Sequence, residues 1–301
     1  PAEPDLARVP ALTENRAVPT VEPLSEALGC RLTGIDLRGD LADDDFRTIE
    51  QALHDHLVVI LPGQQGLDPA RYLAFARRFG RPEPHVIDQF HHPADPNILI
   101  LSNVVVDGRP TGLMDGGTYY HTDYSYLPVP ARCTMLHAIR IADSGAGTGF
   151  ANLRRAWEDL PDATKQRLDG LIGRHHYGNR ENLDEQSRTA ASPLSTDQKA
   201  RMDWVRHPLV RRHPHTGRPT LYSVSGSAFG VEGMDDREGL ELLRELTAHA
   251  TQPKYLHRPS YAEGDVVIWD NCCLLHSAPL TDPTQPRTLW RITVKDAGPT
   301  C

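Results

Sequence analysis

Three residues far apart in the sequence carry the donor atoms of a metal site. His121 and Asp123 are separated by one residue, and side chains two positions apart on a strand point to the same face. His276 lies far downstream, beyond the apolar run Asp265–Trp269. Two imidazoles and one carboxylate form the facial triad that holds ferrous iron and leaves positions open for other ligands. The pattern therefore predicts a mononuclear non-haem Fe(II) site formed by His121, Asp123 and His276.

Other assignments of these residues compete with the iron site. A His-x-Asp pattern also arises by chance, as a surface histidine beside a hydrogen-bonding aspartate. Asp270 competes for the carboxylate role, but an aspartate at a strand end is more typical of a turn. Cys272 and Cys273 suggest zinc with His276, although a zinc site needs more ligands at short spacing than the sequence offers. We therefore favour Asp123 and iron.

Two arginines follow the distal histidine at short distances. Arg287 lies eleven residues after His276, and Arg291 lies four residues later within an apolar, strand-like stretch. An arginine in such a stretch is costly unless it has an anionic partner. A guanidinium binds a carboxylate through two parallel hydrogen bonds, so the distal carboxylate of 2-oxoglutarate is the natural candidate for Arg287. For Arg291, an ion pair with an acidic residue in the core remains an alternative.

Short apolar runs and a few amphipathic segments must position these residues. Strands are predicted over Cys30–Leu37, His56–Leu61, Asn97–Val106, Thr220–Val224, Asp265–Trp269 and Thr288–Val294. Helices are predicted over Asp43–His54, Pro69–Phe79, Leu153–Leu160, Ala163–Ile172 and Arg237–Ala250. Many short strands with a few helices outside them favour a mainly β fold, a sandwich or barrel with helical insertions. A Rossmann fold is disfavoured because no GxGxxG segment follows a strand and opens a helix.

The domain organisation expected from these patterns is simple. Residues 1–20 are rich in Pro, Ala and Glu without periodicity and are predicted to form a flexible arm. Residues 21–301 are predicted to form a single domain, with a helical and loop insertion around 152–205 that contains a loop at 180–195. We see no internal repeat and no linker that divides this part of the chain.

Composition excludes several classes of function. The net charge is −8 and no basic run is present, so nucleic-acid binding is not expected. No apolar run approaches the roughly 20 residues that span a bilayer, so membrane insertion is not expected either. The five cysteines are odd in number and scattered, which favours reduced thiols in the cytoplasm over a disulfide framework.

Four motifs together resemble the taurine/2,4-D dioxygenase (TauD/TfdA) family. They are HTD at 121–123, GTGFAN at 147–152, WDNCCLLH at 269–276 and R-TLW-R at 287–291. The resemblance covers the chain from about Leu28 to Val294. It implies a double-stranded β-helix (a cupin-like jelly roll) and a 2-oxoglutarate-dependent iron(II) enzyme.

The resemblance also implies roles for individual residues. It implies that His121, Asp123 and His276 are the iron ligands, and that Thr148 and Arg287 hold the distal carboxylate of 2-oxoglutarate. Substrate-side residues are implied as well. Arg291 matches the position where relatives meet a sulfonate or carboxylate, and His85 matches a histidine that taurine enzymes use to contact substrate. Phe229 and Ser227 fall where relatives place a loop that lines the substrate.

Two departures from the family pattern concern the substrate. Taurine enzymes carry Asn four residues before the first iron-ligand histidine and Trp directly before it, whereas this chain has Gly117 and Tyr120. The nearby tyrosines suggest a larger or more aromatic guest than taurine: Tyr119, Tyr120, Tyr124 and Tyr126. The presence of Asp123 argues against the halogenating variants of this chemistry, in which a missing carboxylate makes room for halide.

The function predicted from these observations is oxidation of a small, anionic organic substrate. The enzyme would use O2 and 2-oxoglutarate, hydroxylate or otherwise oxidise the substrate, and give succinate and CO2. Two alternatives stay open: a non-catalytic protein that binds a small organic acid on the same barrel, and a zinc hydrolase. The sequence does not choose the substrate or the oligomeric state, and a homo-oligomer is left open.

Overall fold

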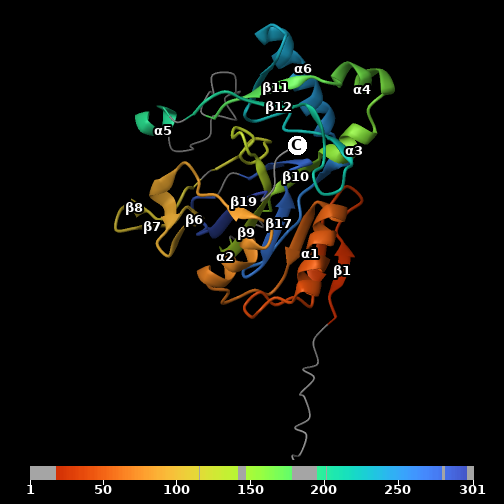
Figure 1. Cartoon of the computed structure of the whole chain (residues 1–301). Helices are drawn as coiled ribbons and strands as arrows, with labels where there is room; N and C mark the ends of the chain where they lie inside the picture. Colours follow the sequence, from red (N-terminus) through yellow and green to blue (C-terminus); the bar gives the residue numbers. More distant parts are fainter. Residues whose placement is uncertain are drawn as a thin grey trace, which may run out of the picture.

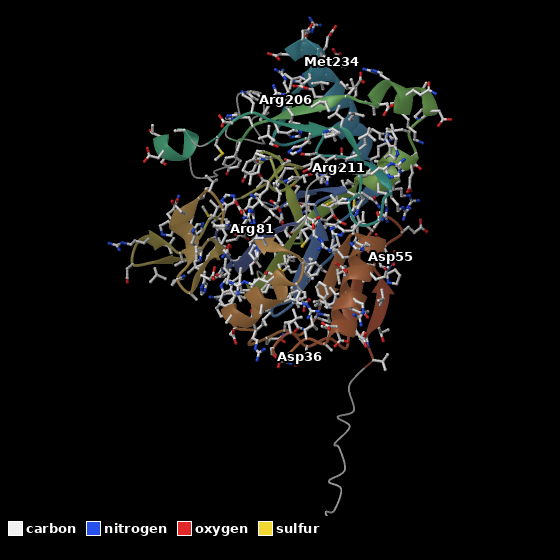
Figure 2. All side chains as sticks on the ribbon, in the orientation of Figure 1. Asp36, Asp55, Arg81, Arg206, Arg211 and Met234 are labelled. Atoms are coloured by element: carbon white, nitrogen blue, oxygen red, sulfur yellow. The ribbon has the colours of Figure 1, made fainter. Side chains whose placement is uncertain are left out.

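The computed structural model describes residues 18–114, 116–141, 147–177, 195–200, 202–279 and 282–296 (Figure 1). The predicted N-terminal arm at 1–20 and the predicted loop at 180–195 lie almost entirely outside the described residues. Within the described residues, no helix is long and apolar enough to cross a membrane. Figure 2 shows side chains on all sides of the ribbon, with charged residues such as Asp36 and Asp55 at its outer edge.

A nine-stranded sheet forms the centre of the molecule, with the order β1-β2-β3-β17-β9-β19-β6-β5 and with β4 paired to β19. Its strands are β1 (Thr20–Pro23), β2 (Cys30–Thr33), β3 (Val58–Leu61), β4 (Arg81–Pro82), β5 (His91–His92), β6 (Asp95–Ser102), β9 (Ala131–Arg140), β17 (Val266–Asp270) and β19 (Thr288–Lys295). Neighbouring strands are antiparallel except for the parallel pair β2 and β3. Strands from both ends of the chain therefore share one sheet.

The two faces of this sheet are both buried, because alternate residues of each strand point to opposite sides. On β17, Val266 and Ile268 join one hydrophobic cluster, whereas Val267 and Trp269 join another. The neighbouring strand β3 divides its residues between the same two clusters. Burial on both sides explains why these strands have continuous apolar runs instead of an alternating pattern.

Two helices cover the outer face of the sheet (Figure 1). Helix α1 (Asp43–His56) begins with three aspartates, which favour the N-terminal end of the helix dipole, and buries Phe46, Ile49 and Leu53. Helix α2 (Pro69–Arg77) begins after Asp68, whose side chain accepts a hydrogen bond from the Arg71 backbone N–H. Both helices match their predicted positions.

A smaller sheet packs on the inner face of the large one. It has the order β16-β10-β18, from β10 (Gly149–Asn152), β16 (Leu256–His257) and β18 (Leu274–Ser277). Phe150 and Leu274 from the small sheet share a hydrophobic cluster with Trp269 and Leu136 from the large sheet. Two sheets packed face to face form the predicted mainly β, jelly-roll core.

Further elements form a third hydrophobic cluster beyond the small sheet. They are α3 (Leu153–Glu158), α4 (Asp162–Leu168), β13 (Val210–Arg212), β14 (Pro219–Leu221), β15 (Ala228–Val231), α6 (Asp236–Ala250) and the 3-10 helix η3 (Pro253–Tyr255). The same part of the chain contains β11 (Ile172–His175), α5 (Thr196–Ala200) and β12 (Val205–Pro208), and β11 pairs with both β12 and β15. Helix α6 packs on β15, the edge strand of the sheet β12-β11-β15, at the top of Figure 1. The short elements β7 (Val105–Val106), β8 (Arg109–Pro110) and η1 (Asp88–Phe90) complete the described chain.

Several predicted boundaries were wrong, including the strand predicted over Thr220–Val224, which ends at Leu221. The strand predicted over Cys30–Leu37 ends at Thr33, and the one over Asn97–Val106 divides into β6 and β7. The helix predicted to reach Ile172 ends at Leu168, because Ile172 begins β11 and pairs with Pro208. In each case the element ends earlier than the apolar residues indicate.

Candidate active site

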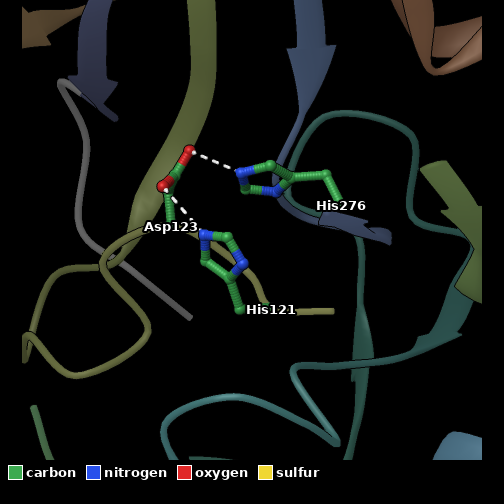
Figure 3. Close-up of side chains that lie close together, drawn as sticks. All are labelled: His121, Asp123 and His276. Atoms are coloured by element: carbon green, nitrogen blue, oxygen red, sulfur yellow. Dashed lines mark ion pairs between the residues drawn. The ribbon is translucent and has the colours of Figure 1, made fainter. Parts of the chain in front are cut away.

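The three predicted iron ligands converge in the structure (Figure 3). His121 Nε2 lies 3.8 Å from Asp123 Oδ1, and His276 Nε2 lies 3.6 Å from Asp123 Oδ2. One donor atom from each of the three residues lies within 4.8 Å of the others. The fold therefore brings together Asp123 and His276, which are 153 positions apart in the sequence (276 − 123).

The local backbone that presents these residues differs from the predicted strand. His121 forms an isolated antiparallel bridge with His276, in which each backbone N–H donates to the carbonyl of the other at 3.0 and 2.8 Å. After this bridge the chain turns at Asp123, and Tyr124 has a φ of 54°. His121 lies in the bridge and Asp123 begins the turn, so the motif brings both side chains to the site without a regular strand.

The hydrogen bonds of His121 prepare it to bind a metal. Its Nδ1 lies 2.8 Å from the carbonyl oxygen of Tyr119, which can only accept a hydrogen bond. Nδ1 therefore carries the proton, and in the neutral ring Nε2 presents its lone pair toward Asp123. This tautomer is the one required when Nε2 is the ligand atom.

The charges of the other two residues also suit a metal. Burial, together with the nearby His121, lowers the pKa of His276 to about 3, so its ring is neutral at pH 7. Burial alone would raise the pKa of Asp123, but Arg291, His276 and His121 together lower it well below its usual range. The site therefore offers the neutral imidazole of His276 and the carboxylate of Asp123, which are the protonation states that metal ligands need.

The distances between the donor atoms allow one ion to reach them. Ligand atoms that each lie about 2.1 Å from an ion are at most about 4.2 Å apart. The 3.6 and 3.8 Å separations fall inside this limit and are too long for hydrogen bonds between the side chains. The residues present therefore fit a single ferrous ion.

Two pockets meet at the triad. The tyrosine pocket is lined by His85, Ile87, Leu113, Gly116, Gly117, Tyr119, His121, Thr122, Asp123, Tyr124, Tyr126, Tyr177, Ser227 and Arg291. The arginine pocket is lined by Leu101, Met114, Gly116, His121, Leu136, Thr148, Trp269, His276, Ala278, Arg287 and Arg291. Three residues line both pockets: Gly116, His121 and Arg291. The triad therefore lies where the two pockets meet, and each pocket can bind a molecule next to it.

A family model described as "Taurine catabolism dioxygenase TauD, TfdA family" matches residues 20–293. The chain belongs to this family. It is 34% identical over 273 residues to the alpha-ketoglutarate-dependent 2,4-dichlorophenoxyacetate dioxygenase of Burkholderia sp. (strain RASC), covering 87% of this chain and 90% of the relative. It is 31% identical over 280 residues to the pentalenolactone F synthase of Streptomyces arenae, covering 90% and 94% of the two chains.

Solved structures agree with these relatives. The crystal structure of AAD-2 in complex with Mn(II) and N-oxalylglycine superposes with a TM-score of 0.78 at 28% identity, covering 95% of this chain and all of that one. This TauD/TfdA protein is therefore a 2-oxoglutarate-dependent dioxygenase that uses Fe(II) and acts on a small organic molecule. The reading as a non-catalytic binding protein is not supported.

The remaining residues predicted for this TauD/TfdA site lie mostly around the two pockets. Thr148 precedes β10 and is buried, as is Arg287 directly before β19, and both line the arginine pocket. His85 and Tyr124 line the tyrosine pocket. Phe229 does not line either pocket. It lies on β15 with its ring centroid 6.5 Å from that of Trp204, whereas Ser227, two residues earlier, lines the tyrosine pocket.

The competing residues near the second histidine have structural partners. Asp270 Oδ2 lies 2.7 Å from His213 Nε2, and its Oδ1 accepts a hydrogen bond from the Cys272 backbone N–H. His213, Asp270 and Cys273 also bring donor atoms within 4.8 Å of one another. However, His213 Nδ1 accepts hydrogen bonds from two backbone N–H groups, so Nε2 carries the proton that Asp270 accepts. These hydrogen bonds stabilise the turn that follows β17, which is the role expected of Asp270.

Three residues at the site were missed by the sequence analysis. Tyr177 lines the tyrosine pocket, and its ring centroid lies 4.4 Å from that of Tyr126. Thr134 and Asn271 are fully buried and hydrogen-bonded around Asp123. Tyr177 follows two histidines in a polar stretch and Thr134 lies in a strand that was not predicted, so neither had a local signal. Asn271 had one, because it lies beside Asp270 in the WDN segment.

Proposed function

We propose that His121, Asp123 and His276 hold the ferrous ion and that Thr148 and Arg287 hold the distal carboxylate of 2-oxoglutarate. The observation that carries this proposal is the position of the triad between the tyrosine pocket and the arginine pocket. The arginine pocket contains the buried guanidinium of Arg287, 4% exposed, and the 3% exposed Thr148. A buried cation beside a hydroxyl suits a carboxylate, because it supplies charge-assisted hydrogen bonds.

When bound, the ferrous ion with O2 and 2-oxoglutarate supplies the oxidising chemistry, in which 2-oxoglutarate yields succinate and CO2 and the substrate is oxidised. The residues of the chain bind, orient and select the reactants. Asp123 remains ionised and His276 remains neutral, so neither must change its protonation state to bind the ion. The two pockets hold the two organic molecules on separate sides of the triad.

We propose a small organic anion with an aromatic or similarly flat body as the substrate. Arg291 lines the tyrosine pocket, and its NH2 lies 3.6 Å from Asp123 Oδ1. Burial alone would lower the pKa of Arg291, but Asp123, Tyr124 and Tyr126 raise it above its usual value, so the side chain is a permanent cation. Tyr124, Tyr126 and Tyr177 provide aromatic walls. Two relatives whose names contain 2,4-dichlorophenoxyacetate and (S)-phenoxypropionate support this substrate class.

We also propose that residues 21–301 form one catalytic domain, since β1 and β19 share the large sheet. A cytoplasmic location is part of the proposal. Four cysteines in the described part of the chain are free thiols, namely Cys30, Cys133, Cys272 and Cys273. Disulfides are rare in reducing compartments, so free thiols support this location.

The experiment that tests the site is a screen for succinate formation. Purified protein is incubated with Fe(II), 2-oxoglutarate and air, and small carboxylates, sulfonates and amino acids are added one at a time. We expect aryl carboxylates to stimulate succinate release and His276→Ala to remain at background with every compound. Stimulation that persists in His276→Ala, or without iron, would contradict the proposed ligand set. Turnover without O2 and 2-oxoglutarate would instead indicate a hydrolase.

The role of Arg287 has its own test. We expect Arg287→Met to raise the KM for 2-oxoglutarate roughly 10- to 100-fold, because hydrogen bonds to a charged group contribute about 1.5–3 kcal/mol. Methionine keeps much of the side-chain volume, so the fold is retained. The matched control is Arg206→Met, which removes an exposed arginine paired with Glu232 and should leave the KM unchanged. Equal KM values in the two variants would remove Arg287 from the site.

A further inference from the structure

A closed ring of hydrogen bonds connects the backbone and the side chain of Asp123. The Asp123 backbone N–H donates to Asn271 Oδ1 at 3.3 Å. Asn271 Nδ2 donates to Thr134 Oγ1 at 2.8 Å. The Thr134 hydroxyl donates to Asp123 Oδ2 at 2.7 Å. The ring therefore begins and ends on the same residue, through two side chains from other parts of the chain.

Every proton in this ring has one possible position. A backbone N–H can only donate, so the oxygen of the Asn271 amide must face Asp123 and its NH2 group must face Thr134. The Thr134 hydroxyl has one proton, and the ionised carboxylate of Asp123 can only accept it. Thr293 Oγ1, at 3.4 Å from Thr134 Oγ1, is a more distant partner. The direction of the hydrogen bonds is thus fixed by chemistry.

The ring lies deep in the fold, on rigid elements. Thr134 is on β9, in the centre of the large sheet, where its Cα pairs with Thr293 of β19 on one side and Trp269 of β17 on the other. Asn271 directly follows β17, and its backbone N–H donates to the Arg132 carbonyl oxygen. Both side chains are fully buried, with no exposed surface. Positions on central strands shift less than positions on loops, so Thr134 can hold the carboxylate in place. Asn271 lies in the turn after β17, but its backbone hydrogen bond to Arg132 connects it to the same strand as Thr134.

The carboxylate needs such a support because its own torsion is soft. The terminal torsion of an aspartate side chain is broad and allows the two oxygens to swing. Asp123 also begins a turn and has no regular strand to hold it. The guanidinium of Arg291 attracts the other carboxylate oxygen, since its Nη2 lies 3.6 Å from Asp123 Oδ1. Without Thr134, the carboxylate would be free to rotate toward the guanidinium and away from the two imidazoles.

We propose that Thr134 and Asn271 are positioning residues that orient the Asp123 carboxylate toward the metal. This inference rests on the proposed function, because it assumes that Asp123 is a metal ligand. Neither residue touches the substrate or 2-oxoglutarate in this arrangement, since neither lines the tyrosine or arginine pocket. Their effect is on the affinity and geometry of the metal site.

The test measures metal binding directly and does not depend on turnover. Co(II) is titrated into metal-free protein by calorimetry, and the visible absorption spectrum of the Co(II) protein is recorded. We expect Thr134→Val to weaken Co(II) binding by roughly 10-fold or more and to alter the spectrum, as is typical when a partner of a ligand is lost. Thr134→Ser keeps the hydroxyl and should bind within about threefold of the wild type, on the same argument.

Two further variants separate positioning from general stability. Asn271→Leu leaves Thr134 in place but removes the amide that directs its proton, and it should also weaken Co(II) binding. Thr220→Val is the matched control, because Thr220 is a fully buried threonine whose hydroxyl donates to the Leu221 carbonyl, away from the site. It should lower thermal stability as Thr134→Val does but leave the affinity and the spectrum unchanged.

The outcomes distinguish the two proposals. Wild-type protein that binds no Co(II) would overturn the proposed metal site, and the positioning role with it. Wild-type binding together with unchanged affinity in both Thr134→Val and Asn271→Leu would overturn the positioning role alone. If Thr134→Val does not fold, Asn271→Leu compared with Thr220→Val decides the question by the same two measurements.

Discussion

His121 is held between two glycines. A Cβ atom on Gly117 would lie 2.4 Å from His121 Cε1, and one on Gly226 would lie 2.5 Å from His121 Cβ. Gly117 also has a φ of +75°, which favours glycine. The position where taurine enzymes have asparagine is therefore glycine here for a physical reason. Any side chain at Gly117 would displace the imidazole from its present position.

Gly117→Ala should accordingly damage the metal site more than the fold. We expect Co(II) affinity to fall at least about tenfold, since a displaced ligand loses its alignment. Unfolding free energy should fall by about 1–2 kcal/mol from the left-handed backbone alone. Gly217→Ala is the control for this strain, because Gly217 has a φ of +69° and no atom within 4 Å of an added Cβ. Calorimetric titration and urea unfolding of both variants would check this, and equal Co(II) affinities would refute it.

At the level of single residues, the sequence predicted those with distinctive chemistry. His121, Asp123 and His276 could be singled out because few combinations of residues bind iron, and Arg287 because a guanidinium shortly after the distal histidine suits a carboxylate. Thr134 could not be identified, since a threonine in a buried strand has many ordinary roles. The positioning role that we propose for Thr134 depends on its hydrogen bond to Asp123, and only the fold brings these two residues together.

The strands of the large sheet have different surroundings on their two faces. On β9, Leu136 points inward and lines the arginine pocket, whereas its neighbour Met135 points outward into the cluster beneath α1 and α2. Both side chains are buried, at 3% and 0% exposure. The same strand thus contributes to the site with one face and to the supporting core with the other.

Truncating each of these two side chains should separate stability from function. We expect Leu136→Ala and Met135→Ala each to lower the unfolding free energy by about 2–5 kcal/mol, as large-to-small core changes do. Only Leu136→Ala should raise the KM for 2-oxoglutarate, because only Leu136 lines the arginine pocket. Urea unfolding and steady-state kinetics on both variants provide the measurement. A similar rise in KM for Met135→Ala would mean that the two faces are not independent.

Elements with strong local patterns could be predicted, and those stabilised by partners could not. Helices α1, α2 and α6 were predicted within about two residues, because each has a clear apolar face and an acidic or capped start. The longest strand, β9, was missed. Its residues Arg132, Thr134 and His137 interrupt the apolar pattern, and each makes a hydrogen bond that exists only in the folded chain.

At the scale of the whole molecule, the mainly β architecture followed from counting short apolar runs, and the jelly roll followed from the family motifs. The pairing order of the strands did not follow from the sequence, because β17 joins β3 and β9 across more than a hundred residues. In the third cluster, α3 was predicted as part of the helical insertion at 152–205 and α6 as a separate helix, but the three-stranded sheet beside α6 was not predicted. Its strands β11, β12 and β15 are only four residues long, and β11 and β12 contain charged residues, so they are stabilised by one another and by α6.

Buried neutral histidines occur throughout the fold and connect its stability to pH. Burial lowers the pKa of eight of them: His54, His85, His92, His137, His175, His207, His257 and His276. His175 on β11 is the one best suited to a test, because it lies outside the proposed ligand set. Burial, with His207 of β12 facing it at 5.3 Å, lowers the pKa of His175 to about 3, and its Nδ1 lies 3.2 Å from Ser227 Oγ.

The direction of the pH effect follows from the two pKa values of His175. Above about pH 6.5 the ring is neutral in both the folded and the unfolded chain, so it contributes no pH dependence. Between about pH 6.5 and pH 3 the unfolded chain binds a proton that the folded chain does not, so stability falls as pH falls, by about 1.4 kcal/mol per pH unit. We expect His175→Gln to reduce the loss of unfolding free energy between pH 8 and pH 5 by roughly 2 kcal/mol. Urea unfolding of metal-free protein in a chelating buffer measures this, and the difference between variant and wild type at pH 8 isolates the packing effect. Equal losses in variant and wild type over that range would show that His175 is not kept neutral by the fold.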